Sequence, residues 1–316
     1  MKSLACRLAA WFVLACATAW AQVEAPLLGY LPDSGKIRPV YGIPAAAAIV
    51  SPLDYGPDFA LLAVAPGQDY ALASVAASGA VVLISPGHNP APLAGVAPGP
   101  GRMVISPRGS SAAFWFADTQ RAQIVSGLPD APRVRDVDAS SLGDAPDALA
   151  VSDDGQWLAG AWTDGVFALG PGGELRKLPL RERTAALAFF AGRQDLALAT
   201  RFHIFSIQDV GGSATVSALY ESASQESRTL DPAGLAVSSS NRHLVVAEKS
   251  GNLLTLDLTA GSLARFDCGC APDGVFAMGR SLFRLTNLAG GAFKLFDAAT
   301  GEVFFVPLAE AEGGRQ

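Results

Sequence analysis

Short apolar runs separated by turn signals make up most of the chain, and residues 148–178 give the clearest example (ALAVSDDGQWLAGAWTDGVFALGPGGELRKL). Four apolar runs are separated there by three turn signals, at Asp153–Gly155, Asp164–Gly165 and Gly170–Gly173. Asp-Gly and glycine-rich pairs supply the positive φ angles that tight hairpins need. The stretch therefore predicts a meander of four antiparallel strands.

Variants of this unit recur along the chain. The first turns of six units start at Val64, Ile105, Val151, Phe189, Val237 and Phe276. The intervals between these residues are 41, 46, 38, 48 and 39. A period near 40 residues with four strands per unit is typical of the blades of a β-propeller, in which stacking successive blades completes the core. The sequence therefore predicts an all-β fold of four-stranded antiparallel blades.

The segment before the first unit decides the number of blades. Leu27–Tyr41 is expected to form two strands around a Pro-Asp-Ser-Gly turn, and residues 45–51 a third. Counting this segment as a blade gives seven blades, and treating it as a closing strap gives six. Its length favours seven. We predict a single propeller domain over 22–308 and a frayed tail over 309–316.

Three turns carry a resemblance to known proteins: Ser-Pro-Arg-Gly at 106–109, Ser-Asp-Asp-Gly at 152–155 and Thr-Gly-Glu-Val at 300–303. Over roughly residues 27–308 the chain resembles secreted bacterial β-propellers with WD40-like or YVTN-like repeats. The Gly-His and Trp-Asp signatures of true WD40 repeats are missing. The resemblance implies a fold, and a function only by analogy, because propellers serve as enzymes, ligand binders and docking platforms.

The N-terminus predicts export. A basic start with Lys2 and Arg7 precedes an apolar run over 8–17 and a small-x-small site at 19–21, which is the pattern of a secretory signal peptide over residues 1–21. We therefore expect a periplasmic or extracellular protein. Val-Leu-Ala-Cys at 13–16 resembles a lipoprotein box, so an alternative cleavage would leave a lipid anchor on Cys16. The apolar run is too short to span a bilayer, and no other segment is long enough.

Charge and composition limit the classes of partner that the protein is expected to bind. Half of the residues are apolar and 16% are charged, with 33 glycines and 21 prolines, which suits many short buried strands joined by tight turns. Loss of residues 1–21 removes two of the 23 basic residues and none of the 29 acidic ones, so the net charge changes from −6 to −8. An acidic surface disfavours nucleic acid and anionic lipid as partners.

One face of the propeller is expected to carry the binding residues. Connections between blades emerge on the same face as the loops between second and third strands, and the two long intervals come from inter-blade insertions at 138–147 and 220–232. Polar loops on a rigid scaffold often bind ligands, although these insertions are equally explained as tolerated surface loops. The residues expected to bind a ligand or partner are Asp147, Arg181, Arg183, Glu221, Asp231 and Asp273.

Cys268-Gly269-Cys270 is the cysteine pair that remains after cleavage at 21. In an oxidising compartment we expect a local disulfide, with free thiols, an intermolecular bond, or metal or redox chemistry as the alternatives. The three histidines, His88, His203 and His243, lie in different repeats without ligand spacing, and we interpret the last two as edge or packing residues.

The remaining candidate chemistry is sparse. Asp153, Asp154 and Asp164 do not follow the order of a calcium-binding loop and are interpreted as turn formers. Trp115, Trp157 and Trp162 are expected on strands, packed between blades.

We therefore predict a non-catalytic propeller that binds another protein or an extracellular ligand through its inter-blade loops. The alternative is a lactonase-like hydrolase or lyase that uses Asp147, Asp231 and Asp273 at the channel mouth with a divalent ion such as calcium. A quinoprotein-like cofactor binder is a third possibility. No cofactor is otherwise predicted.

Overall fold

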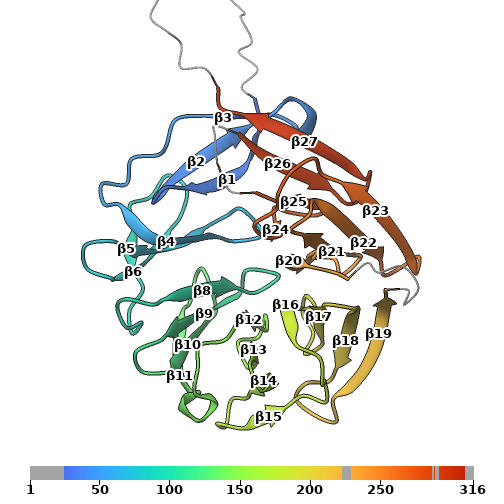
Figure 1. Ribbon diagram of the computed structural model, residues 1–316. Coiled ribbons are helices and arrows are strands. Elements are labelled where there is room, and N and C mark those ends of the chain that lie inside the picture. Colours follow the sequence, from blue (N-terminus) through green and yellow to red (C-terminus); the bar gives the residue numbers. More distant parts are fainter. Residues whose placement is uncertain (1–24, 223–228, 287, 289–291, 310–316) are drawn as a thin grey trace, which may run out of the picture.

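The structure, a computed structural model, describes residues 25–222, 229–286, 288 and 292–309. The predicted signal peptide with Cys16, and the predicted tail beyond residue 309, lie outside the described residues. The described strands form seven antiparallel sheets arranged in a ring (Figure 1). The chain is thus an all-β, seven-bladed propeller, as the sequence predicts.

Six blades have four strands and the first has three. From the inner edge outward, blade 1 contains β1 (Leu27–Asp33), β2 (Lys36–Tyr41) and β3 (Ala48–Ile49). Blade 2 contains β4 (Phe59–Val64), β5 (Ala71–Val75), β6 (Val81–Ile84) and β7 (Ala91–Pro92); blade 3 contains β8 (Arg102–Ile105), β9 (Ser111–Phe116), β10 (Arg121–Ser126) and β11 (Arg133–Asp138). Blade 4 contains β12 (Ala148–Val151), β13 (Leu158–Trp162), β14 (Gly165–Leu169) and β15 (Leu175–Lys177); blade 5 contains β16 (Thr184–Phe189), β17 (Leu196–Thr200), β18 (His203–Gln208) and β19 (Thr215–Glu221). Blade 6 contains β20 (Pro232–Val237), β21 (His243–Glu248), β22 (Asn252–Asp257) and β23 (Ser262–Asp267); blade 7 contains β24 (Phe276–Ala277), β25 (Leu282–Arg284), β26 (Ala292–Asp297) and β27 (Glu302–Pro307). Two short 3-10 helices, η1 (Pro44–Ala46) and η2 (Ser140–Leu142), lie in connections.

The turns explain why the repeats fold alike. Gly165 has a φ of 132° and closes the β13–β14 hairpin opposite Trp162. At the first turns of blades 4 and 6, Gly155 and Asn241 have φ angles of 66° and 59°. Glycine adopts this conformation without strain, and asparagine tolerates it better than most residues. The two units therefore share a backbone turn as well as a sequence offset.

The core lies between neighbouring blades. Between blades 3 and 4, the rings of Trp115 and Trp162 meet edge to face with centroids 6.2 Å apart. Between blades 4 and 5, Trp157 packs in a cluster with the fully buried Phe189. Trp115 lies on β9 and Trp162 on β13, while Trp157 immediately precedes β13. The three tryptophans pack between blades, as the sequence predicts.

Blade 1 closes the ring, and its inner strand runs in the opposite direction to the inner strand of the next blade. The backbone N–H of Tyr30 donates to Oε1 of Gln68, which follows β4, at 2.7 Å. At its other end, Gly35 O accepts a hydrogen bond from the N–H of Phe59, the first residue of β4, at 3.0 Å. The inner strand β1 therefore runs antiparallel to β4.

The chain end completes this closure on the outside of the ring. Ile49 of β3 forms a parallel bridge with Leu308, and its carbonyl oxygen accepts a hydrogen bond from the N–H of Ala309 at 2.7 Å. In Figure 1, β27 accordingly lies beside β3. Blade 1 is thus held between the first repeat unit and the last.

The first turns of the blades are tied together on the face opposite the inter-blade connections. The Asp153 carboxylate accepts hydrogen bonds from the N–H groups of Arg108 at 2.8 Å and Gly192 at 2.6 Å, in the two flanking blades. Asp154 Oδ1 accepts bonds from the Ser152 hydroxyl and the Gln156 N–H within its own turn. Both aspartates serve the turns, as the sequence predicts, and Asp153 also links three blades.

Candidate functional site

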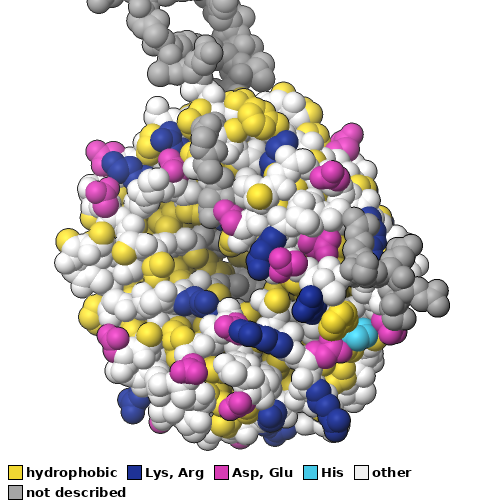
Figure 2. Space-filling view, in the orientation of Figure 1, with side chains coloured by type: hydrophobic (Ala, Val, Ile, Leu, Met, Phe, Trp, Pro, Cys, Tyr) yellow, Lys and Arg dark blue, Asp and Glu magenta, His cyan; other side chains and the backbone are white. Residues whose placement is uncertain are grey.

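The centre of the ring holds a cavity of about 320 Å³, and the inner strands of the seven blades form its wall. Figure 2 shows this hollow, with apolar side chains inside it and charged side chains of both signs around its opening. The volume lies within the usual range of small-molecule sites. The channel is therefore the first candidate site.

Alanine keeps the channel open. In the wall, the middle residue of the apolar triplet along the inner strand is alanine in blades 2, 4, 5 and 6 and valine in blade 3, whereas the short inner strand of blade 7 places Phe276 in the same layer: Ala63, Ala150, Ala188, Ala236 and Val104. Ala188 and Ala236 are half-buried, whereas their flanking residues on the same strands are buried. Because side chains alternate along a strand, the small residues face the channel and the large ones pack between blades.

Arg284 is the charged residue among those that line the cavity. It lies on β25 directly opposite Phe276, the first residue of β24, and only 6% of it is exposed. Its guanidinium carbon is 3.9 Å from the Phe276 ring centroid, and Nη1 donates to the Thr286 carbonyl oxygen at 3.1 Å. Burial lowers the pKa of Arg284 to about 10, and the Asp273 carboxylate partly opposes this shift. Arg284 is therefore cationic at neutral pH.

The carboxylates nominated from the sequence lie beside basic groups. Asp147 pairs with Arg183 at 2.9 Å, and Asp231 pairs with Lys249 at 3.0 Å. Both aspartates immediately precede the inner strands of their blades, β12 and β20. Asp273 precedes β24 and is close enough to Arg284 to shift its pKa. The face thus presents charge pairs contributed by different loops.

A second cluster on the same face centres on His203. Its Nδ1 lies 2.8 Å from Glu182 Oε1, and its Nε2 lies 3.7 Å from Glu221 Oε1. The Thr200 hydroxyl donates to Glu182 Oε2 at 2.6 Å. Arg181 is exposed on the same connection as Glu182. The cluster joins the connection between blades 4 and 5 to the outer strand of blade 5.

The role of His203 was missed by the sequence interpretation, which treated it as an edge or packing residue. One signal was available: the loop between second and third strands shares a face with the inter-blade connections, and His203 directly follows such a loop. His88 is exposed, and its Nδ1 lies 3.0 Å from Pro86 O within its turn. His243 is buried as interpreted, and burial lowers its pKa.

The His203 cluster predicts a pH-dependent contribution to stability. The hydrogen bond to Glu182 raises the pKa of His203 above its ordinary value of 6.5. A group whose pKa is raised in the folded state stabilises fully below its unfolded pKa, and this contribution is lost as the pH rises through the folded value. We expect His203→Gln to lower the free energy of unfolding by about 1 kcal/mol at pH 5.5 and by much less at pH 9.

Urea unfolding of both proteins at the two pH values measures this difference. The matched control is His88→Gln, since His88 is exposed on a turn. A loss that is equal at both pH values would contradict the ion pair.

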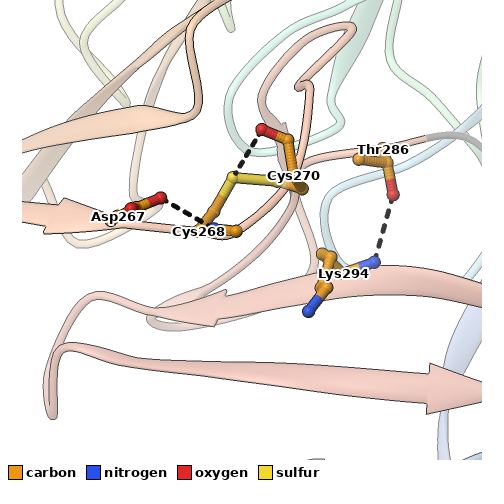
Figure 3. Close-up of a disulfide and its surroundings, with 6 residues drawn as sticks. Asp267, Cys268, Cys270, Thr286 and Lys294 are labelled. Atoms are coloured by element: carbon orange, nitrogen blue, oxygen red, sulfur yellow. Dashed lines mark hydrogen bonds between the residues drawn. A yellow bond between two sulfur atoms is a disulfide. The ribbon is translucent and has the colours of Figure 1, made fainter.

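Cys268 and Cys270 are joined by a disulfide in the connection between blades 6 and 7 (Figure 3). The N–H of Gly269 donates to Asp267 Oδ1 at 2.8 Å, and the N–H of Cys268 donates to Gly251 O at 2.9 Å. Cys268 is 3% exposed and packs in a cluster with Phe283 and Leu285, which flank Arg284 on the chain. The disulfide thus lies against the segment that carries Arg284.

The described residues contain no group of three or more His, Cys, Asp or Glu side chains placed to hold a metal ion. Nor does this part of the chain contain a helix long and apolar enough to cross a membrane.

Comparison with known proteins identifies the fold. No protein-family model and no curated protein sequence matches the chain. Among solved structures it is similar to apo AztD from Citrobacter koseri, with 14% identity and a TM-score of 0.57, covering 88% of this chain and 93% of that one. It is also similar to Kuenenia stuttgartiensis hydrazine synthase (14% identity, TM-score 0.52, 93% and 99% covered) and to Saccharomyces cerevisiae Sqt1 (11%, 0.54, 90% and 86%). At these identities the likeness supports the β-propeller fold and leaves function to the site itself.

Proposed function

We propose that the protein is a non-catalytic secreted or periplasmic scaffold that binds another protein or an extracellular ligand on the face of its inter-blade connections. We name this surface the loop face. It is defined by residues 138–147, 181–183, 201–203, 220–222, 229–232, 249–251 and 268–275. A rigid propeller that presents polar loops from several blades on one side suits recognition.

The pairing of carboxylates with bases carries the proposal. Asp147 faces Arg183, Asp231 faces Lys249, and Asp273 interacts with Arg284. A general base or metal ligand needs a carboxylate that is available to a proton or an ion, and a neighbouring cation competes for it. Alternating charges at an interface instead supply complementarity and specificity toward a partner. The arrangement therefore favours binding over the hydrolase alternative.

Charge reversal on the loop face tests the proposal. In a capture experiment, the bait protein carries both Arg183→Glu and Lys249→Glu. A control bait carries both Arg193→Glu and Arg242→Glu, which lie on the opposite face. All four bases are exposed and each pairs with an aspartate. Partner proteins are captured from the exported fraction of the source organism and quantified by mass spectrometry, and the measurement is repeated with the purified partner. The amount of partner captured should fall at least tenfold for the loop-face variant. Equal losses for both variants, or none, would contradict the proposal.

Two measurements check the associated claims. N-terminal sequencing of the exported protein should give a start at Gln22, whereas an acylated Cys16 would show lipid anchoring. Metal analysis and a thermal-shift screen with calcium address the hydrolase alternative. A calcium-dependent shift that is lost in Asp147→Asn would favour that alternative.

A further inference from the structure

One large aromatic ring lies in the channel wall at a level that small residues otherwise occupy. At the ends of the inner strands of blades 6 and 7, the N–H groups of Ser238 and Met278 make the same hydrogen bond to the second strand. Ala236 and Phe276 each lie two residues earlier, so both belong to one layer of the wall. Blades 2 to 5 contribute the alanines and the valine named above to this layer. Phe276 is 42% exposed, so a large apolar surface remains accessible inside the cavity.

The protein holds the Phe276 ring from one side. Arg284 lies directly opposite it on the second strand β25 and is 6% exposed, and its guanidinium carbon is 3.9 Å from the ring centroid. Because β25 lies farther from the axis than β24, the guanidinium covers the side of the ring that is turned away from the channel. A Cβ atom on Gly274 would lie 2.7 Å from two ring atoms, so the edge of the ring rests against this glycine. The other side of the ring is left for a ligand.

The site favours a neutral ligand. The charge of Arg284 is engaged within the protein, since Nη1 donates to the Thr286 carbonyl oxygen at 3.1 Å and the Asp273 carboxylate opposes the lowering of the Arg284 pKa. Most of the remaining wall is apolar (Figure 2). A cation over one face of an aromatic ring also polarises the π electrons toward itself, which favours an electron-rich ring on the other face.

We propose that the channel binds a small, neutral, electron-rich aromatic molecule, stacked on Phe276 and surrounded by the alanines of the same layer. Such a ligand gains both from the removal of apolar area from water and from the contact between rings. The inference concerns the interior of the channel and holds whether or not the loop face binds a partner.

The volume limits the size of the ligand. An apolar cavity of about 150 Å³ accommodates benzene, so a cavity of about 320 Å³ takes a bicyclic molecule of roughly ten to twelve non-hydrogen atoms. The probe 2-naphthol has this size, is neutral at neutral pH and is electron-rich. Decahydro-2-naphthol has the same skeleton and hydroxyl group without the π electrons. A ligand of this size in a fitting apolar site should bind with a Kd on the order of 1 mM or tighter.

Isothermal titration calorimetry with these two probes tests the proposal. We expect the native protein to bind 2-naphthol about fivefold more tightly than decahydro-2-naphthol, because only the aromatic probe can stack on Phe276. Phe276→Leu should remove this preference and leave the affinity for the saturated probe within about twofold of the native value. Phe276→Tyr retains a ring and should retain the preference.

Two further variants separate channel binding from other effects. Phe202→Leu is the matched control, since Phe202 on the loop face is 46% exposed and its ring also lies beside an arginine, Arg201, at 5.8 Å; it should bind as the native protein does. Ala188→Phe leaves Phe276 intact but fills the channel from blade 5, and should weaken the binding of both probes at least tenfold.

The proposal is overturned if 2-naphthol shows no binding at roughly 3 mM. It is equally overturned if the saturated probe binds as tightly as the aromatic one, or if Phe276→Leu or Ala188→Phe binds 2-naphthol as the native protein does. Loss of the preference in Phe202→Leu would place the aromatic contact on the loop face and also contradict the proposal.

Discussion

Val306→Asp is expected to open the ring, lowering the free energy of unfolding by about 4 kcal/mol or more. Val306 on β27 is fully buried and packs with Leu31 and Ile49 of blade 1. A carboxylate at this position would lose its hydration without a described cation in that cluster to compensate it. Because blade 1 has three strands and depends on its contact with blade 7, the damage falls on the closure of the ring.

The neighbouring residue provides the control. Phe305 is 61% exposed, since adjacent side chains on a strand point to opposite faces. Phe305→Asp should cost less than about 1 kcal/mol, which includes the loss of its contact with Lys294. Urea unfolding of both variants gives the comparison. Similar losses for the two would show that closure does not depend on the Val306 contact.

Phe189→Ala is expected to lower the free energy of unfolding by about 4 kcal/mol. Phe189 ends the inner strand of blade 5, is fully buried in the cluster between blades 4 and 5, and also contributes to the channel wall. Its removal leaves a void that the rigid blades cannot fill by collapse, because neighbouring strands fix its surroundings.

Phe202→Ala is the matched control for this substitution. Phe202 is 46% exposed on the loop face, so its truncation should cost less than about 1 kcal/mol. Chemical denaturation followed by intrinsic fluorescence measures both changes. A small loss for Phe189→Ala would mean that blades 4 and 5 rearrange to fill the space, contrary to the packing described above.

The repeat pattern predicted the blades because each is built from local hairpins. Val64, Ile105, Val151, Phe189 and Val237 are all the last residues of inner strands. The sixth position, Phe276, instead begins β24, because that short strand and the turn after it depart from the other units. The reversed direction of β1 could not be predicted, since it depends on contacts with Gln68 and Phe59 from another blade.

From the sequence, only the face that carries the candidate site could be predicted, and not the pairs that its residues form. Repeat alignment places Asp147 and Asp231 before inner strands, but their pairing with Arg183 and Lys249 depends on how loops and strands of different blades meet. The alanines of the channel wall are visible in the aligned repeats. Their role in lining a channel cannot be predicted from the repeats alone, because one side of each inner strand faces a common centre only when the ring of blades is closed.

The claim that the loop face is the working face is tested most directly by hydrogen–deuterium exchange of the protein alone and saturated with its purified partner. The account predicts added protection in residues 138–147, 181–183, 220–222, 229–232 and 268–275, where loops of several blades meet around the channel. Protection confined to the first turns, at 106–110, 152–156, 190–194 and 238–242, would place binding on the opposite face and contradict the account.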